Sequence, residues 1–160
     1  DTGDTRVAFM DADGLKFFND TAAANALDDY EEGSWTPSFQ NDNGGTYGTR
    51  VGVYIKVGKL VMATFMLQYS NAGSSSGAVA VTGFPFVALN STGIYGMSSS
   101  VHGTGWTTTR NSLNILIPPG QTITNPVYYN MAAAGSSFGL TQHSDLGTGN
   151  LLATLVYHAN

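Results

Sequence analysis

Hydrophobic and polar residues alternate after residue 35 with the two-residue period of β-strands. The clearest runs are residues 46–56 and 60–69, which are rich in Val, Tyr, Phe, Met and Thr and are joined through Val57, Gly58 and Lys59. A glycine between two such runs is typical of a β-hairpin. Further short strands are expected at residues 78–82, 93–101, 113–117, 127–132 and 151–158.

The number and spacing of these runs predict an all-β fold. Turn-forming residues cluster at 71–77, 118–120 and 147–150 and separate the runs. Roughly eight short strands with Gly-rich turns and almost no helix favour an antiparallel β-sandwich, a jelly roll or a small barrel. Of these, we expect an antiparallel β-sandwich of the jelly-roll kind, which forms a head over residues 35–160.

The first 34 residues follow a different pattern. Apolar bursts at residues 6–10 and 15–18 flank Asp13 and Gly14, a pair that predicts a tight turn or hairpin. The Ala-rich segment that follows predicts a short helix over about residues 20–32, capped by Asn19 or Asp20, because Ala is the best helix former. Residues 1–34 are therefore expected to form a shaft end and an acidic connector.

Four carboxylates lie within five positions of the stretch LDDYEEGSWTP, residues 27–37. A glycosidase needs two carboxylates in a cleft, one with a raised pKa, and nothing in this polar stretch predicts such a cleft. Asp28 followed three residues later by Glu31 instead fits a helix capping box, and Gly33 fits the end of the turn. In an assembly of several copies these acids should point into solvent or meet Arg50 or Lys56 of the head, because like charges repel.

Composition excludes several classes of function. The formal net charge of −5 and the six scattered Lys and Arg residues argue against a nucleic-acid partner. The chain has no cysteine, so disulfides and thiol catalysis are excluded. No apolar run approaches the ~20 residues of a membrane-spanning helix. The chain begins at Asp1 without an initiator Met, and we expect it to be a piece of a longer protein.

Motifs for metal binding and for nucleophilic catalysis are not found. His102, His143 and His158 lack the spacing of a metal site. The segment that begins at Asp11 starts like a calcium loop, but it lacks the glycine and the glutamate that an EF-hand needs at its sixth and twelfth positions. There is no GxSxG motif. We expect no cofactor, no metal and no enzymatic activity.

Residues 26–37, ALDDYEEGSWTP, resemble the LDDYEEGTWTP motif of bacteriophage tail fibre and tailspike proteins, with Ser34 where that family usually has Thr. Residues 14–17, GLKF, resemble the last repeat of the family's shaft. Residues 45–61 are similar to its YxKxGxxV hairpin, and the apolar run at 151–157 is similar to its terminal strand. Residues 70–150 carry no motif of the family.

The resemblance implies a C-terminal fibre module, assembled as a homotrimer at the tip of a virion tail fibre, that contacts the host cell surface. It places the joint between shaft and head in the acidic stretch, with Trp35 buried between subunits. The joint residues are then Leu27, Asp28, Tyr30, Glu31 and Trp35.

Residues 98–111, SSSVHGTGWTTTRN, are the best candidate for a glycan-binding loop. An aromatic face covers the CH groups of a sugar, and polar neighbours bind its hydroxyls. An alternative is that Trp106 closes one end of the sandwich or a seam between subunits. Two consecutive tyrosines in the strand expected at 127–132 must point to opposite faces, which leaves Tyr129 as a further candidate. The candidate glycan-binding residues are His102, Trp106, Thr108, Arg110 and Tyr129.

These observations together predict a fibre tip that adheres to a host polysaccharide or lipopolysaccharide by multivalent, non-catalytic binding. Two other functions stay open. The head is a trimerisation and folding module whose fibre binds its host through another protein, or it is a polysaccharide depolymerase or esterase.

Overall fold

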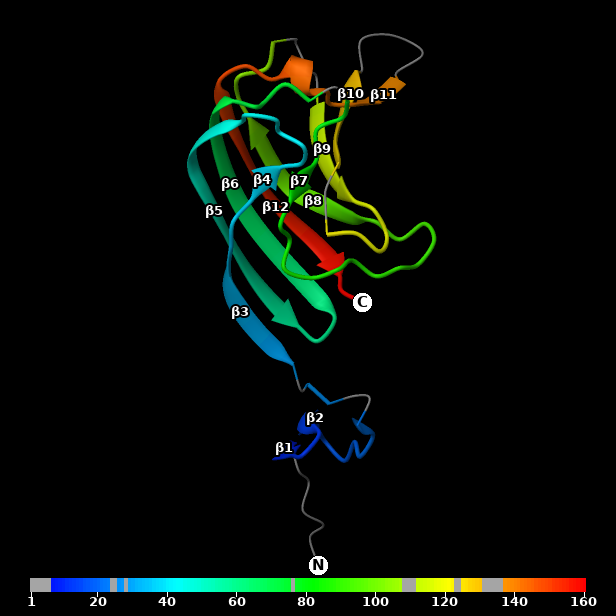
Figure 1. Ribbon diagram of the computed structural model, residues 1–160. Coiled ribbons are helices and arrows are strands. Elements are labelled where there is room, and N and C mark those ends of the chain that lie inside the picture. Colours follow the sequence, from blue (N-terminus) through cyan, green and yellow to red (C-terminus); the bar gives the residue numbers. More distant parts are fainter. Residues whose placement is uncertain are drawn as a thin grey trace, which may run out of the picture.

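The computed structural model describes residues 7–23, 26–27, 29–75, 77–107, 112–122, 125–130 and 137–160. These residues form strands with antiparallel pairing throughout, and the predicted all-β, antiparallel class is confirmed. Figure 1 shows a head built on one large curved sheet, with a small hairpin beneath it on the side of the N-terminus.

The large sheet contains eight strands in the order β11-β10-β9-β8-β12-β6-β5-β3. Their bounds are β3 Tyr30–Trp35, β5 Thr46–Val57, β6 Leu60–Asn71, β8 Gly96–Gly103, β9 Ser112–Ile117, β10 Asn125–Asn130, β11 Ser137–Leu140 and β12 Gly149–His158. The N-terminal hairpin pairs β1 (Ala8–Asp11) with β2 (Gly14–Phe17), and a second two-stranded sheet pairs β4 (Ser38–Phe39) with β7 (Val81–Thr82). A short 3₁₀ helix, η2, covers His143–Asp145.

The predicted hairpins are confirmed. β5 and β6 have twelve residues each and pair from Val57 with Leu60 up to Thr46 with Asn71. Their tight turn needs a left-handed backbone conformation, which Gly58 supplies with a φ of 55°. The turn expected at Asp13 and Gly14 likewise joins β1 to β2.

The helix expected over about residues 20–32 is wrong. The Asp20 carboxylate accepts a hydrogen bond from the Ala22 amide at 2.9 Å, which makes a local turn. Residues from Tyr30 onward form β3, which pairs with β5. Pairing with β5 thus takes the C-terminal part of the expected helix into the sheet. Asp28, the expected capping residue, lies outside the described residues.

The hydrophobic core lies on one face of the large sheet, which we call the inner face. Large side chains such as Phe65, Leu67, Ile115 and Leu155 point to it and are fully buried. The β4–β7 sheet packs on this face through Phe39 and its strand partner Val81. Most of the strands expected to divide between two layers therefore belong to one sheet, and a two-stranded sheet and loops cover its inner side (Figure 1).

Candidate functional site

The opposite face of the large sheet, which we call the outer face, is apolar and uncovered in the described chain. Along β5 and β6, every second side chain points to it. The exposed fractions include 52% for Val51, 51% for Val53 and 45% for Met62. On β5, β6, β8 and β12, the large hydrophobic side chains of this face that are more than one third exposed are Val51, Val53, Ile55, Val57, Leu60, Met62, Met97 and Val156.

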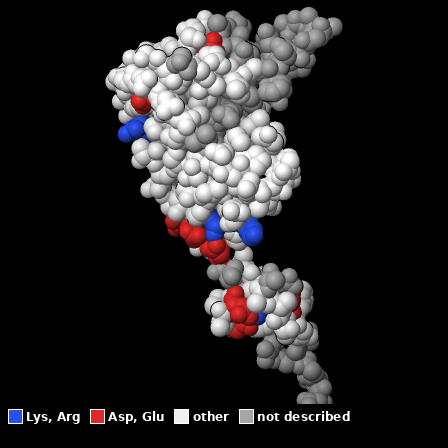
Figure 2. Space-filling model, turned by 45° about the vertical axis from the view of Figure 1, so that its right-hand side comes forward, with Lys and Arg blue, Asp and Glu red and all other residues white. Residues whose placement is uncertain are grey.

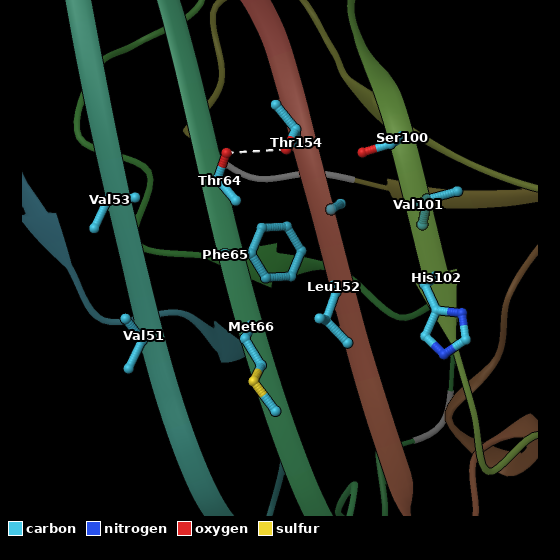
Figure 3. A pocket seen from close by; sticks show the side chains of 11 residues that line it. Val51, Val53, Thr64, Phe65, Met66, Ser100, Val101, His102, Leu152 and Thr154 are labelled. Atoms are coloured by element: carbon cyan, nitrogen blue, oxygen red, sulfur yellow. Dashed lines mark hydrogen bonds between the residues drawn. The ribbon is translucent and has the colours of Figure 1, made fainter.

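Strand register aligns these side chains in rows that run across the sheet. One row joins Ile55, Met62, Val156 and Met97 across β5, β6, β12 and β8. The next row is polar at its centre, where the hydroxyls of Thr64 and Thr154 form a 2.9 Å hydrogen bond (Figure 3).

A further row joins Val51, Met66, Leu152 and His102. Together with the Thr row it lines a shallow open hollow of about 440 Å³ (Figure 3). Because most of its lining is apolar, the hollow suits an apolar surface better than a sugar.

Charged side chains gather at the narrow junction between the head and the N-terminal hairpin, as Figure 2 shows. The Lys56 ammonium group binds both Asp29 and Glu31, at 3.0 Å from the Glu31 carboxylate. It also lies 5.3 Å from the ring centre of Phe86, a cation–π distance. The expectation that the acids meet Lys56 is confirmed within one chain, whereas Arg50 lies over the Tyr47 ring instead.

Hydrogen bonding at this junction shifts three pKa values. The bond from Lys56 lowers the pKa of Asp29 below its usual value, and the bond to Asp29 raises the pKa of Lys56. On the outer side of β3, the Tyr30 hydroxyl donates a 2.8 Å hydrogen bond to Glu32, which raises the pKa of Tyr30. These acids therefore hold the junction together, and the pKa of Asp29 moves away from that of a general acid.

The same arrangement recurs in the hairpin. The buried Lys16 ammonium group donates hydrogen bonds to Asp11 at 3.0 Å and to Asp13 at 2.6 Å. The bond from Lys16 lowers the pKa of Asp11.

Acid should loosen the junction. A carboxylate with a lowered pKa stabilises the fold above its unfolded pKa, near 3.8, and this contribution is lost as the pH falls through the folded value. We expect Asp29→Asn to lower the melting temperature at pH 7, and the difference from the wild type to shrink below about pH 4. Thermal melts of both proteins between pH 2.5 and 7 measure it. A difference that stays constant over this range would contradict the role of Asp29.

Trp35 packs against the core of its own chain, and the expectation that it is also buried between subunits stays a prediction. Its indole lies 4.4 Å from the Phe84 ring and 5.7 Å from the Phe65 ring, centre to centre. Side chains alternate between the two faces along β3, which explains why Trp35 points to the core. Trp35 and Glu31 lie on the inner side, and Tyr30 and Glu32 lie on the outer side. Of the other joint residues, Leu27 is partly exposed and forms an isolated antiparallel β-bridge with Leu15 of the hairpin.

Two glycines give space to aromatic rings on the neighbouring strand. Trp35 pairs with Gly52, and Gly33 pairs with Tyr54. A Cβ atom added at Gly52 would overlap the indole, and one added at Gly33 would lie 2.8 Å from the Tyr54 hydroxyl oxygen. Gly33 was expected to end a turn. It lies inside a strand instead, where the absence of a side chain lets Tyr54 cross it.

Among the described residues, the candidate glycan-binding side chains of His102 and Trp106 do not share one site. His102 is exposed on the outer face opposite Leu152. Trp106 is half-buried, packs against the core and covers Gly103 on the inner side, so it lies across the sheet from His102. Tyr129 lies on β10, opposite Phe138 of β11. Thr108 and Arg110 lie outside the described residues.

The other histidines take structural positions. His143 is buried, with Nδ1 3.1 Å from the carbonyl oxygen of Ala72, and His158 is exposed near the end of β12. Within the described ranges no group of three His, Cys, Asp or Glu side chains is placed to hold a metal ion. In the same part of the chain no helix is long and apolar enough to cross a membrane.

The apolar outer face was not predicted from the sequence. The first eight residues of β6 are LVMATFML, which are mostly apolar on both faces of the strand, and β5 has Val or Ile at the outer positions 51, 53, 55 and 57. A strand with only one buried face shows polar residues at every second position, and continuous apolar runs are typical of strands buried on both faces. These runs were therefore a signal for a second buried face.

A scan against protein-family models and searches of curated proteins and of solved structures found no match to this chain.

Proposed function

We propose that this chain is the tip of a bacteriophage tail fibre, in which three copies form a head that adheres to a glycan on the host surface without catalysing a reaction. The resemblance of residues 26–37 to the fibre motif supports this proposal. The head is then sandwich-like, with β4 and β7 closing the inner face and neighbouring copies closing the outer one.

The observation that carries the proposal is the division of the chain into a charged hairpin and a nearly uncharged head (Figures 1 and 2). Within the described residues, the charged side chains of the head above the junction are Arg50, Asp42 and Asp145. A hydrogen-bonding surface with few charges suits neutral sugars and avoids nonspecific ionic contacts. Three heads on one fibre would convert weak single contacts into strong attachment.

A head fused to a fluorescent protein should bind some strains of a bacterial panel and spare others. Lipopolysaccharide or capsule purified from the bound strains should compete with this binding. Equal binding to all strains, or binding that neither glycan reduces, would contradict the proposal.

We expect Trp106→Ala to weaken binding to a bound strain by roughly thirtyfold or more, because truncating an aromatic hot spot costs about 2 kcal/mol or more. Flow cytometry with the labelled head measures it, and circular dichroism and molar mass confirm that the variant keeps its fold and assembly. Tyr95→Ala, at an aromatic side chain that is 51% exposed on the segment before β8, is the matched control. Unchanged binding by a folded Trp106→Ala head would show that Trp106 is not part of the binding site, whereas a head that serves assembly alone would bind no strain.

A further inference from the structure

We propose that the outer face is the contact surface between copies of this chain, and that the rotation axis of the assembly runs along β5 and β6. The inference rests on the outer face itself. It does not require that the assembled head binds a host.

The size of the face fits a stable contact. At ~3.3 Å per residue, the twelve residues of β5 and of β6 span about 40 Å. The four strands of the face, β5, β6, β12 and β8, are about 19 Å wide at a spacing of ~4.8 Å. The product, roughly 750 Å², is close to the ~800 Å² that each partner contributes to an interface of standard size. Exposed apolar patches of more than a few hundred Å² are rare on monomers.

The chemistry of the face fits another copy of itself. Its centre holds Val53, Ile55 and Met62 without a charged side chain, and its rim holds polar groups such as Gln68 and the Tyr30–Glu32 pair. An apolar centre inside a polar rim is the usual anatomy of a protein interface. A charged partner would find no counter-charge at this centre, whereas an identical face matches it in size and polarity.

The hairpin fixes the direction of the axis. Its side chains Val7, Met10, Phe17 and Phe18 are 72%, 78%, 52% and 67% exposed. Figure 1 places the hairpin beyond one end of β5 and β6. An axis parallel to these strands keeps the hairpins of all copies at the same end, where their apolar side chains also meet. An axis perpendicular to the strands would separate the hairpins and leave them in water.

Light scattering tests the contact. The wild type should have a molar mass that is a multiple of 16.8 kDa, three chains in the proposed fibre tip. Val53→Glu, at the centre of the face, should reduce it to one chain. Val87→Glu, the same change at a side chain 43% exposed on the loop before β8, should leave the mass unchanged. A single-chain wild type, or a Val53→Glu variant with the wild-type mass, would overturn the proposal.

Cross-linking gives an independent test, because the chain has no native cysteine. Thr64→Cys, in the central row of the face, should join copies through a disulfide or a short bis-maleimide. Thr92→Cys, at an exposed turn before β8, should not. Equal cross-linking of both variants would contradict the assignment. A single-chain wild type that floats with phosphatidylcholine vesicles would assign the face to a membrane and overturn the proposal. Strain binding is measured separately, so assembly without adhesion would refute the proposed function and leave this inference intact.

Discussion

Replacing Trp35 with Ala should lower the free energy of unfolding by about 3 kcal/mol. Truncation of a well-packed Trp costs about 3–5 kcal/mol, and Trp35 falls at the low end because it is only half-buried. The change removes the contacts with Phe84 and Phe65 and uncovers Gly52. For a chain of this size the melting temperature should fall by roughly 6–12 °C. Differential scanning calorimetry or a urea titration measures the effect.

Trp35→Phe is the matched control. Phe retains most of the ring contact, and it removes an indole N–H that is buried without a hydrogen-bond partner among the described residues. An unpaired buried donor is costly, so this variant should lose less than about 1 kcal/mol. Gly52→Val, in contrast, drives a side chain into the space of the indole and should be as harmful as Trp35→Ala. A Trp35→Ala protein with wild-type stability would show that the motif tryptophan does not anchor β3 to the core.

The second large effect should come from Leu155, next to Val156 on β12. Leu155 is fully buried on the inner face, so Leu155→Ala should cost about 2–5 kcal/mol at every protein concentration. Val156 is 38% exposed on the outer face, so Val156→Ala should cost little in a single chain. If the outer face is a contact between copies, the loss at Val156 should also depend on concentration, because association contributes to the measured stability.

Thermal melts at two concentrations a hundredfold apart separate the two effects. A Leu155→Ala protein with a melting temperature close to that of the wild type would contradict the placement of Leu155 in the core. A stability difference between Val156→Ala and the wild type that is equal at both concentrations would count against assembly through this face.

The sequence predicted the strands with the strongest alternation and missed those that depend on distant partners. The β5–β6 hairpin follows from apolar residues around Gly58, and β12 follows from its own apolar run. β3 was mistaken for a helix because its acids and its glycine look like turn and capping residues in isolation. Its pairing with β5 can be recognised only from the strand register, in which Glu31 lies opposite Lys56 and Trp35 lies opposite Gly52.

The candidate site was predicted less well, because sequence distance does not show which face of a strand a residue occupies. His102 and Trp106 are four residues apart, yet they lie on opposite sides of the sheet. A register is needed to place such residues, and the register of β8 is shifted by an irregularity opposite Thr154 and Leu155. In the acidic stretch, in contrast, Lys56 was correctly named as a partner of the acids.

The position of β12 has a consequence for how the protein is made. β12 comes last in sequence order among the strands, yet it lies in the middle of the sheet between β6 and β8. Until β12 is synthesised, no strand joins β6 to β8, and β6 exposes an unpaired edge. Contacts between residues 60 and 158 are also slow to form, because the loop between them must close first. The large sheet should therefore form only after β12 has been synthesised, and a chain that stops before residue 149 should aggregate rather than fold.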